Sequence, residues 1–222
     1  MKIVGINGSP RGGRSATLQL IEAVLEGAKE KGAEVDVVHL IDLDLKFRNA
    51  CSACFQEGKC VDEDDFPNLY EKIKAADGLV LGSPVYFDLV TGQMKLLIDR
   101  MADGIQCQSL TGKYGCSVAT SGDHAEPAVV TYLNHFLQML GATPVGNVGV
   151  AIGKDPGALA KAKETAHELG KTLAEAIQTR RQYPQIEAFH KRFQEKFKAV
   201  IAGEKPEWPG DYDHWVNQAW VW

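Results

Sequence analysis

The sequence contains no long hydrophobic run and no dense cluster of basic residues. No apolar stretch approaches the roughly 18 residues that a membrane span needs, so we expect no transmembrane segment. The 24 lysine and arginine residues are outnumbered by 29 aspartate and glutamate residues, for a net charge of −5. Because nucleic-acid-binding surfaces gather basic side chains, this composition argues against a nucleic acid partner. The opening MKIVGING lacks the apolar core and cleavage site of a leader, which predicts no signal peptide and a cytoplasmic location.

Cysteine is also scarce, at five residues in 222. In a cytoplasmic protein these are expected to be reduced thiols or metal ligands rather than structural disulfides. Three of the five, Cys51, Cys54 and Cys60, fall within ten residues of one another. Such clustering calls for an explanation of its own.

Apolar strand-like and amphipathic helix-like segments alternate along the chain. The strands are expected at Lys2–Asn7, Glu34–Leu40, Gly78–Ser83, Tyr114–Ser121 and Thr143–Val150. Helices are expected at Ser15–Lys31, Phe66–Ala75, Thr91–Met101, Pro127–Leu140 and Pro156–Arg180, and the cysteines lie in a polar loop between the second strand and second helix. This alternation predicts an α/β fold with a doubly wound, five-stranded parallel sheet of the flavodoxin-like order 2-1-3-4-5.

The character of the chain changes after Arg180. A charged amphipathic helix is expected at Ile186–Ile201, and all four tryptophans (208, 215, 220 and 222) follow it. We therefore divide the chain into a domain at residues 1–180 and an extension at 181–222. The extension either packs on the domain or, since tryptophan often anchors interfaces, forms a contact between subunits.

The loop after the first strand, GSPRGGRS, nearly matches the P-loop of nucleoside triphosphatases. It fits G-x-x-x-x-G-K-[ST] except that Arg14 replaces the lysine, and arginine is a poor substitute for a compact ammonium group. The candidate partner strand GLVLGSP ends without the carboxylate that would hold Mg²⁺. The dinucleotide fingerprint G-x-G-x-x-G also fails, because the glycines have the wrong spacing. The sequence thus disfavours both nucleotide sites.

The same loop has the chemistry of a metal-free phosphate site. A glycine-rich turn before a helix aims backbone N–H groups and the helix dipole at one point. Hydroxyls from Ser9, Ser15 and Thr17 add donors, and Arg11 or Arg14 adds charge. The alternative is a tight turn that is merely capped by Ser15.

Three separated motifs resemble those of the NAD(P)H-dependent FMN reductases of the flavodoxin-like superfamily. They are Gly8–Arg11 with Ser15–Thr17, then Gly82–Phe87 followed by VTGQMK and IDR, and finally Thr120–Gly122. The resemblance covers about residues 1–150. It implies that FMN is bound by Ser9, Arg11, Ser15, Ala16, Thr17, Pro84, Val85, Tyr86, Phe87, Thr120, Ser121 and Gly122. Ordinary loop packing is the alternative role for Tyr86 and Phe87.

The resemblance also implies a function. It predicts an FMN-dependent oxidoreductase that moves electrons from NAD(P)H, or from a protein donor, to a small acceptor such as a quinone or a flavin. The flavin would carry the chemistry, so no catalytic side chain is predicted. A homodimer or homotetramer is expected. The alternative is an electron carrier that docks a redox protein and has no small-molecule substrate.

The cysteine segment, C-x2-C-x5-C, resembles the cluster-binding motif of the iron–sulfur flavoproteins. That motif has four cysteines, and Arg48 stands where the first would be. Thiolates are the preferred ligands of iron–sulfur clusters, which makes Cys51, Cys54 and Cys60 candidate ligands. The alternatives are a cluster with a non-cysteine fourth ligand, a three-iron cluster, a Cys51/Cys54 redox pair, or a loop that binds nothing.

Overall fold

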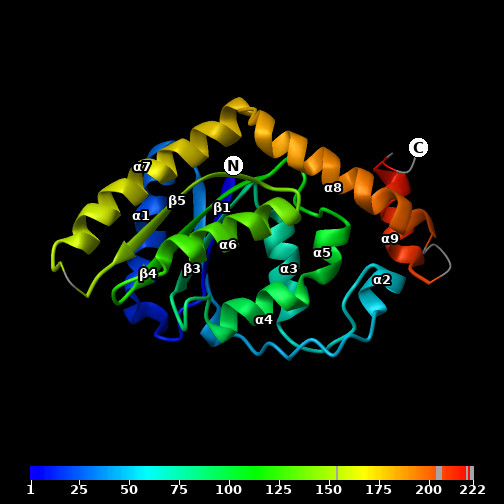
Figure 1. The fold of residues 1–222 in the computed structure, drawn as a ribbon, viewed down its shortest axis with the longest axis horizontal. Helices are drawn as coiled ribbons and strands as arrows, with labels where there is room; N and C mark the ends of the chain where they lie inside the picture. Colours follow the sequence, from blue (N-terminus) through cyan, green and yellow to red (C-terminus); the bar gives the residue numbers. More distant parts are fainter. Residues whose placement is uncertain (154, 204–206, 219, 221–222) are drawn as a thin grey trace.

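A parallel five-stranded sheet forms the centre of the computed structural model, which describes residues 1–153, 155–203, 207–218 and 220. The strands are β1 (Lys2–Asn7), β2 (Glu34–His39), β3 (Gly78–Pro84), β4 (Tyr114–Ser121) and β5 (Thr143–Ala151). Their order is β2-β1-β3-β4-β5 (Figure 1), which confirms the predicted fold and topology. The central strands β3 and β4 are buried along almost their whole length, as expected when helices cover both faces of a parallel sheet.

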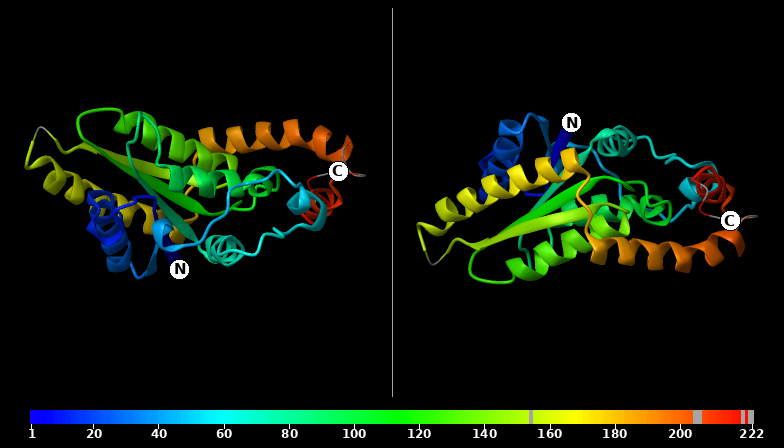
Figure 2. Two further views of the ribbon diagram at one scale, coloured as in Figure 1. Left: turned by 90° about the horizontal axis from the view of Figure 1, so that it is seen from below. Right: turned by 90° about the horizontal axis from the view of Figure 1, so that it is seen from above.

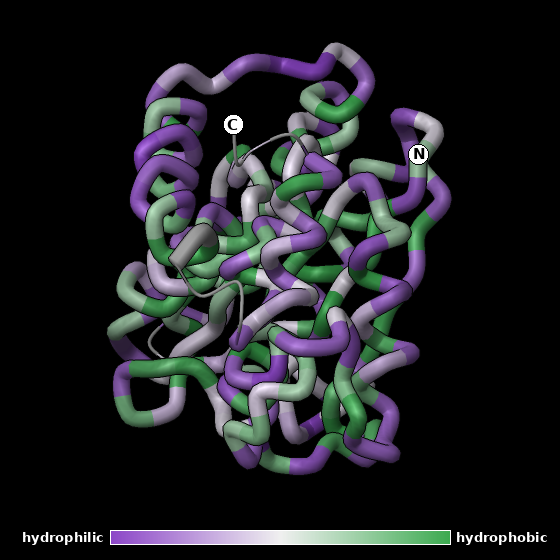
Figure 3. Tube along the Cα trace, turned by 90° about the vertical axis from the view of Figure 1, so that its right-hand side faces the viewer, coloured by the Kyte–Doolittle hydropathy of each residue, from purple (hydrophilic) through white to green (hydrophobic). Residues whose placement is uncertain are grey.

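Helices form a layer on each face of the sheet (Figure 2). One layer contains α1 (Ala16–Glu30) and α7 (Ala158–Thr179), and its core includes Ile21, Val24 and Leu173. The other contains α3 (Phe66–Ala75), α4 (Gly92–Arg100) and α6 (Glu126–Met139). Along many helices the hydropathy alternates between polar and apolar (Figure 3), as expected of helices with one buried face.

Helices α1 and α7 pack against each other with their backbones in close contact. A Cβ atom added at Gly170 would lie 1.8 Å from the carbonyl oxygen of Val24, and one added at Gly27 would lie 1.9 Å from that of His167. Glycine at these two crossing points therefore sets the separation of the helices.

Three short helices were not predicted from the sequence. The cysteine segment, expected to be a loop, contains α2 (Ala53–Glu57), and α5 (Ala102–Gln106) follows α4 directly. The ends of α2 are marked by Ser52 and Gly58, both in the left-handed region with φ of 62° and 70°. Five-residue helices of this kind give too weak a periodic signal to be found from sequence.

The C-terminal extension consists of α8 (Pro184–Gly203) and the third unpredicted helix, α9 (Pro209–Asn217). In Figure 1, α8 leads away from the sheet to α9, which lies beside α2. The ring of Trp208 packs on Phe55 of α2 at 5.2 Å between centroids, and the indole of Trp215 donates to the Gln106 carbonyl. Of the four tryptophans assigned to this extension, Trp222 lies outside the described residues.

Across the described residues, no helix combines the length and apolar character required to cross a bilayer.

Candidate functional site

A cavity of about 260 Å³ opens at the carboxyl ends of β1, β3 and β4. Strand order reverses between β1 and β3, and in open α/β sheets ligands bind at this kind of edge. Twelve residues line the cavity, and eleven of them belong to the set predicted from the sequence: Ser9, Arg11, Ser15, Ala16, Thr17, Pro84, Val85, Tyr86, Thr120, Ser121 and Gly122. The twelfth is Ile152, which follows β5 and carries no sequence signal that could have identified it.

Asn7, the last residue of β1, holds the glycine-rich loop in place through side-chain hydrogen bonds. Its side-chain oxygen accepts from the Ser9 N–H at 3.1 Å, and its amide nitrogen donates to the Gly12 carbonyl at 3.2 Å. The same nitrogen lies 3.0 Å from Nδ1 of His39. Asn7 is fully buried, so these contacts are shielded from water. The motif comparison did not single out Asn7, although an amide directly before a glycine-rich turn is a recognisable signal.

The first wall of the cavity presents hydroxyl groups on a helix N-terminus. Ser9, Ser15 and Thr17 are each no more than 2 % exposed. Ser15 caps α1 by accepting from the Leu18 N–H. The first N–H groups of a helix have no acceptor within the helix, and Ala16 and Thr17 at that position line the cavity. An anion at this point would meet hydroxyls, amides and the positive end of the helix dipole.

Direct hydrogen bonds join the three chain segments that form the walls of the cavity, residues 9–17, 84–86 and 120–122. The hydroxyls of Thr17 and Thr120 lie 2.7 Å apart, and the Val85 N–H donates to the Thr120 carbonyl at 2.8 Å. Thr91, which caps α4, also donates to the Gly8 carbonyl at 2.6 Å. The cavity is therefore held by contacts between segments that lie as much as 103 positions apart in the chain.

A tight turn at residues 86–89 borders the cavity. Tyr86 and Leu89 exchange two backbone hydrogen bonds of 2.9 and 3.1 Å, and the two residues between them have positive φ. Tyr86 lines the cavity, whereas the side chain of Phe87 is fully exposed at 102 % and does not. Phe87 is thus the one predicted cofactor residue that does not line this cavity, and it lines a neighbouring hollow instead.

A second, open hollow of about 350 Å³ adjoins the cavity and shares Val85, Ser121 and Gly122 with it. His124 lies at its rim, with Nε2 3.1 Å from Asp88 and Nδ1 paired with Asp123. The neighbouring Asp123 carboxylate, and then Asp88, raise the pKa of this imidazole above its ordinary value. The pairing links the 86–89 turn to the loop after β4.

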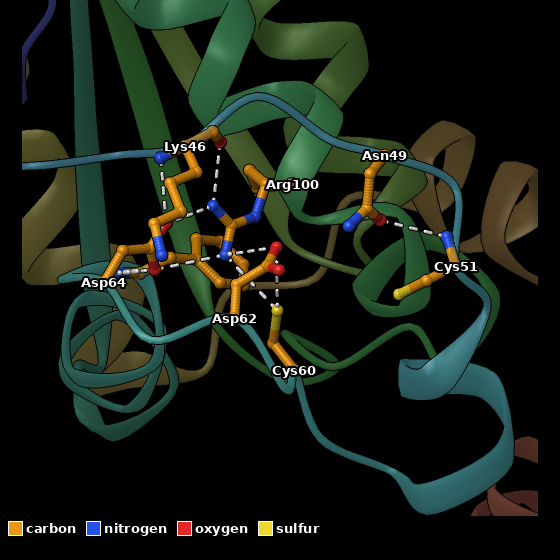
Figure 4. Close-up of polar contacts among 8 residues, drawn as sticks. Lys46, Asn49, Cys51, Cys60, Asp62, Asp64 and Arg100 are labelled. Carbon is orange, nitrogen blue, oxygen red and sulfur yellow. Dashed lines mark hydrogen bonds and ion pairs between the residues drawn. The ribbon is translucent and has the colours of Figure 1, made fainter.

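The three clustered cysteines lie away from this cavity, around a much smaller one of about 30 Å³. Cys51 and Cys60 come from the two arms of the loop (Figure 4), and Cys54 is on α2. Burial raises the pKa of Cys54 to about 12, with nearby Asp103 and Asp211 adding to the shift. Within the described part of the chain, no three His, Cys, Asp or Glu side chains come together in a way that could hold a metal ion.

Comparison with known proteins identifies related chains. The model of the family described as NADPH-dependent FMN reductase matches residues 1–157. An iron-sulfur flavoprotein of Archaeoglobus fulgidus is 33 % identical over 224 residues, which covers 100 % of both chains. An iron-sulfur flavoprotein of Methanocaldococcus jannaschii is 34 % identical over 190 residues, covering 80 % of this chain and 97 % of the relative.

The fold also resembles that of solved structures. A flavone reductase superimposes with a TM-score of 0.65 at 22 % identity, covering 80 % of this chain and 63 % of the other. At this level of identity the similarity concerns the fold alone. The sequence relationships, in contrast, extend through every segment that lines the cavity.

Proposed function

The chain belongs to the NADPH-dependent FMN reductase family, and from that premise we propose that it is an FMN-dependent oxidoreductase. Electrons would pass from NAD(P)H to a small acceptor such as a quinone or free flavin. The observation that carries the proposal is the cavity of about 260 Å³, where residues 9–17, 84–86 and 120–122 meet. Bound FMN would supply the redox chemistry, so no side chain is assigned as an acid, base or nucleophile.

The first wall is suited to the phosphate of FMN. Buried hydroxyls of Ser9, Ser15 and Thr17 and the N-terminus of α1 offer neutral donors, while Arg11 adds a positive charge at the exposed side. These groups bind an anion without a metal ion, in keeping with the absence of an acidic residue at the end of β3.

The other two walls are suited to a flat ring system. Pro84, Val85 and Tyr86 provide an apolar edge, and Gly122 leaves open space because nothing lies within 4 Å of where its Cβ would be. The Thr17–Thr120 hydrogen bond keeps the phosphate wall and the ring wall at a fixed separation. The chain would thus position the ring and leave one side open toward the hollow lined by Asp123 and His124.

Steady-state kinetics test the activity. Protein reconstituted with FMN is expected to oxidise NADPH or NADH rapidly when menadione is supplied as acceptor. If the flavin stays oxidised with either nucleotide under anaerobic conditions but is reduced by ferredoxin, the protein is an electron carrier instead. Failure to bind FMN after reconstitution would contradict both functions.

Substitutions in the first wall test the assigned cavity. Hydrogen bonds to a charged group contribute about 1.5–3 kcal/mol, and 1.4 kcal/mol corresponds to tenfold in affinity. Ser9→Ala is therefore expected to weaken FMN binding roughly tenfold or more, and Arg11→Ala to weaken it in a salt-dependent way. Thr179→Ala, at the exposed end of α7, is the control and should bind FMN like the unchanged protein.

We also propose that the chain forms a homodimer or homotetramer, with residues 1–180 carrying the site and 181–222 acting as an extension. Large apolar side chains at Phe47, Phe87 and Leu89 are exposed by 85 %, 102 % and 58 %, which supports burial against another subunit. Light scattering coupled to gel filtration measures the subunit number directly, and a monomer at every concentration would contradict the proposal.

A further inference from the structure

The cysteine segment, defined as residues 48–62, encloses little space. Cys51, Cys54 and Cys60 all line its cavity of about 30 Å³. Although all three thiols line this cavity, they do not come together in a way that could hold a metal ion.

A buried cation fixes the Cys60 side of this cavity (Figure 4). The guanidinium of Arg100, only 5 % exposed, donates to Sγ of Cys60 at 3.3 Å and to the Lys46 carbonyl at 2.8 Å. It also pairs with Asp64 and lies 3.5 Å from Asp62. Cys60 is therefore held by a guanidinium that several partners keep in place.

The C-terminal helix fixes the other side, at α2. A Cβ added at Gly210 of α9 would lie 2.7 Å from the backbone nitrogen of Gly58, so the two backbones are in direct contact. The tilted contact between the rings of Trp208 and Phe55, with 5.2 Å between centroids, adds to it. The segment is therefore anchored at two places, at Cys60 by Arg100 of α4 and at α2 by α9.

Arg48 occupies the position where a fourth ligand is needed. Cys51 and Cys54 are three positions apart, and a further ligand at the same interval before Cys51 would be residue 48, which is Arg48. Arg48 lines the same cavity as the thiols. A [4Fe–4S] cluster is ordinarily held by four cysteine thiolates. A guanidinium has no acceptor and does not lose its proton in proteins, so it cannot be a metal ligand.

The remaining cysteines do not replace it. Cys116 is fully buried in β4 and packs in the α1/α7 core. Cys107 follows α5, its sulfur lies 3.5 Å from Oδ1 of Asp211, and it does not line the cavity. All five cysteines are among the described residues, and only three of them reach the cavity.

We infer that the cysteine segment is a three-thiol cavity closed at its fourth corner by Arg48, and that this chain holds no [4Fe–4S] cluster there. In this respect it differs from what the names of its two archaeal relatives state about those proteins. The inference is independent of the proposed function, because FMN content and iron content are measured separately on the same sample.

Three forms of the full chain test it: the unchanged protein, Arg48→Cys and Arg48→Ser. Each is produced with iron and sulfide in supply, purified without oxygen and analysed for iron, acid-labile sulfide and FMN. We expect only trace iron in the unchanged protein and in Arg48→Ser. In Arg48→Cys, which restores the fourth thiol, we expect about four irons and four sulfides per chain, with the electron paramagnetic resonance signal of a reduced cluster.

Each outcome decides between the alternatives. About four irons in the unchanged protein would overturn the inference, whichever residue completed the ligand set, including the nearby Asp62. Iron gained by Arg48→Ser would show that space or charge, not a missing ligand, is the obstacle. A folded Arg48→Cys protein without iron would refute the role of position 48, and if that variant does not fold, the iron content of the unchanged protein settles the question.

Discussion

Replacing Asn7 by alanine should weaken cofactor binding although this side chain does not line the cavity. Asn7 accepts from the Ser9 N–H and donates to the Gly12 carbonyl, and it is fully buried under the loop. Alanine removes both bonds and leaves the Ser9 N–H without this partner, while the Gly12 carbonyl keeps its bond from the Ser15 N–H. The loop that we assign to the FMN phosphate then has to be ordered by the ligand itself.

The size of the effect follows from these two bonds. Each hydrogen bond contributes about 1 kcal/mol net, and a buried group left without a partner costs about 1–3 kcal/mol. Because the outer side of the loop is open to water and can relax, we expect a loss of about 2 kcal/mol in stability. If binding has to restore the same order, FMN affinity falls roughly tenfold to thirtyfold, since 1.4 kcal/mol is tenfold.

The assay is titration of the FMN-free protein, followed by quenching of flavin fluorescence, with thermal unfolding measured in parallel. Asn7→Asp keeps the shape and the acceptor for Ser9 but loses the donor and adds a negative charge near the phosphate, so its affinity should be lower still. Asn147→Ala, at an exposed position of β5, is the matched control. Affinity of Asn7→Ala within twofold of the unchanged protein would refute the reasoning.

Three further predictions concern packing and ionisation. Gly170→Ala places a Cβ 1.8 Å from the α1 backbone, so it should destabilise the folded protein by about 2–3 kcal/mol and lower its unfolding temperature by roughly 5–10 °C. Gly92→Ala, which has open space around its Cβ position, is the control and should leave the unfolding temperature unchanged. Burial raises the pKa of the Asp211 carboxyl to about 7, so the folded protein keeps a proton that the unfolded chain loses above about pH 4. The free energy of unfolding should therefore fall as the pH rises from 4 to 7. Asp211→Asn should remove that fall in thermal unfolding curves. His124 should titrate above its ordinary pKa by NMR, and Asp123→Asn should lower that value; an unchanged value would contradict the pairing.

Much of the fold and of the candidate cavity could be predicted because the signals are local. The strand of residues 78–83 is continuously apolar, and the loop at residues 8–15 is rich in glycine and hydroxyl side chains. In a parallel sheet with a reversal of strand order, the ends of neighbouring strands must meet at one edge. The meeting of residues 9–17, 84–86 and 120–122 could therefore be predicted from topology alone, without knowledge of side-chain packing.

The residues that sequence reasoning missed depend on tertiary packing. Ile152 enters the cavity wall because the chain after β5 pairs with the segment after β4, where the Ile152 N–H donates to Ser121 at 3.0 Å. Phe87 lies in a two-residue turn with positive φ and lines the adjoining hollow rather than the cavity, so its contact with FMN stays a prediction. Neither the pairing nor the direction of that turn is encoded in a short motif.

The cysteine segment shows why a motif can be a poor guide to a metal centre. Its ligand spacing is local, but the space between the thiols is set from a distance, by Arg100 on one side and by α9 on the other. Residue 48 then determines whether a fourth ligand exists at all, and the arginine at this position supplies none. The loop, its three cysteines and its packing are therefore compatible with a fourth position that holds no thiol, and the Arg48→Cys experiment supplies that thiol.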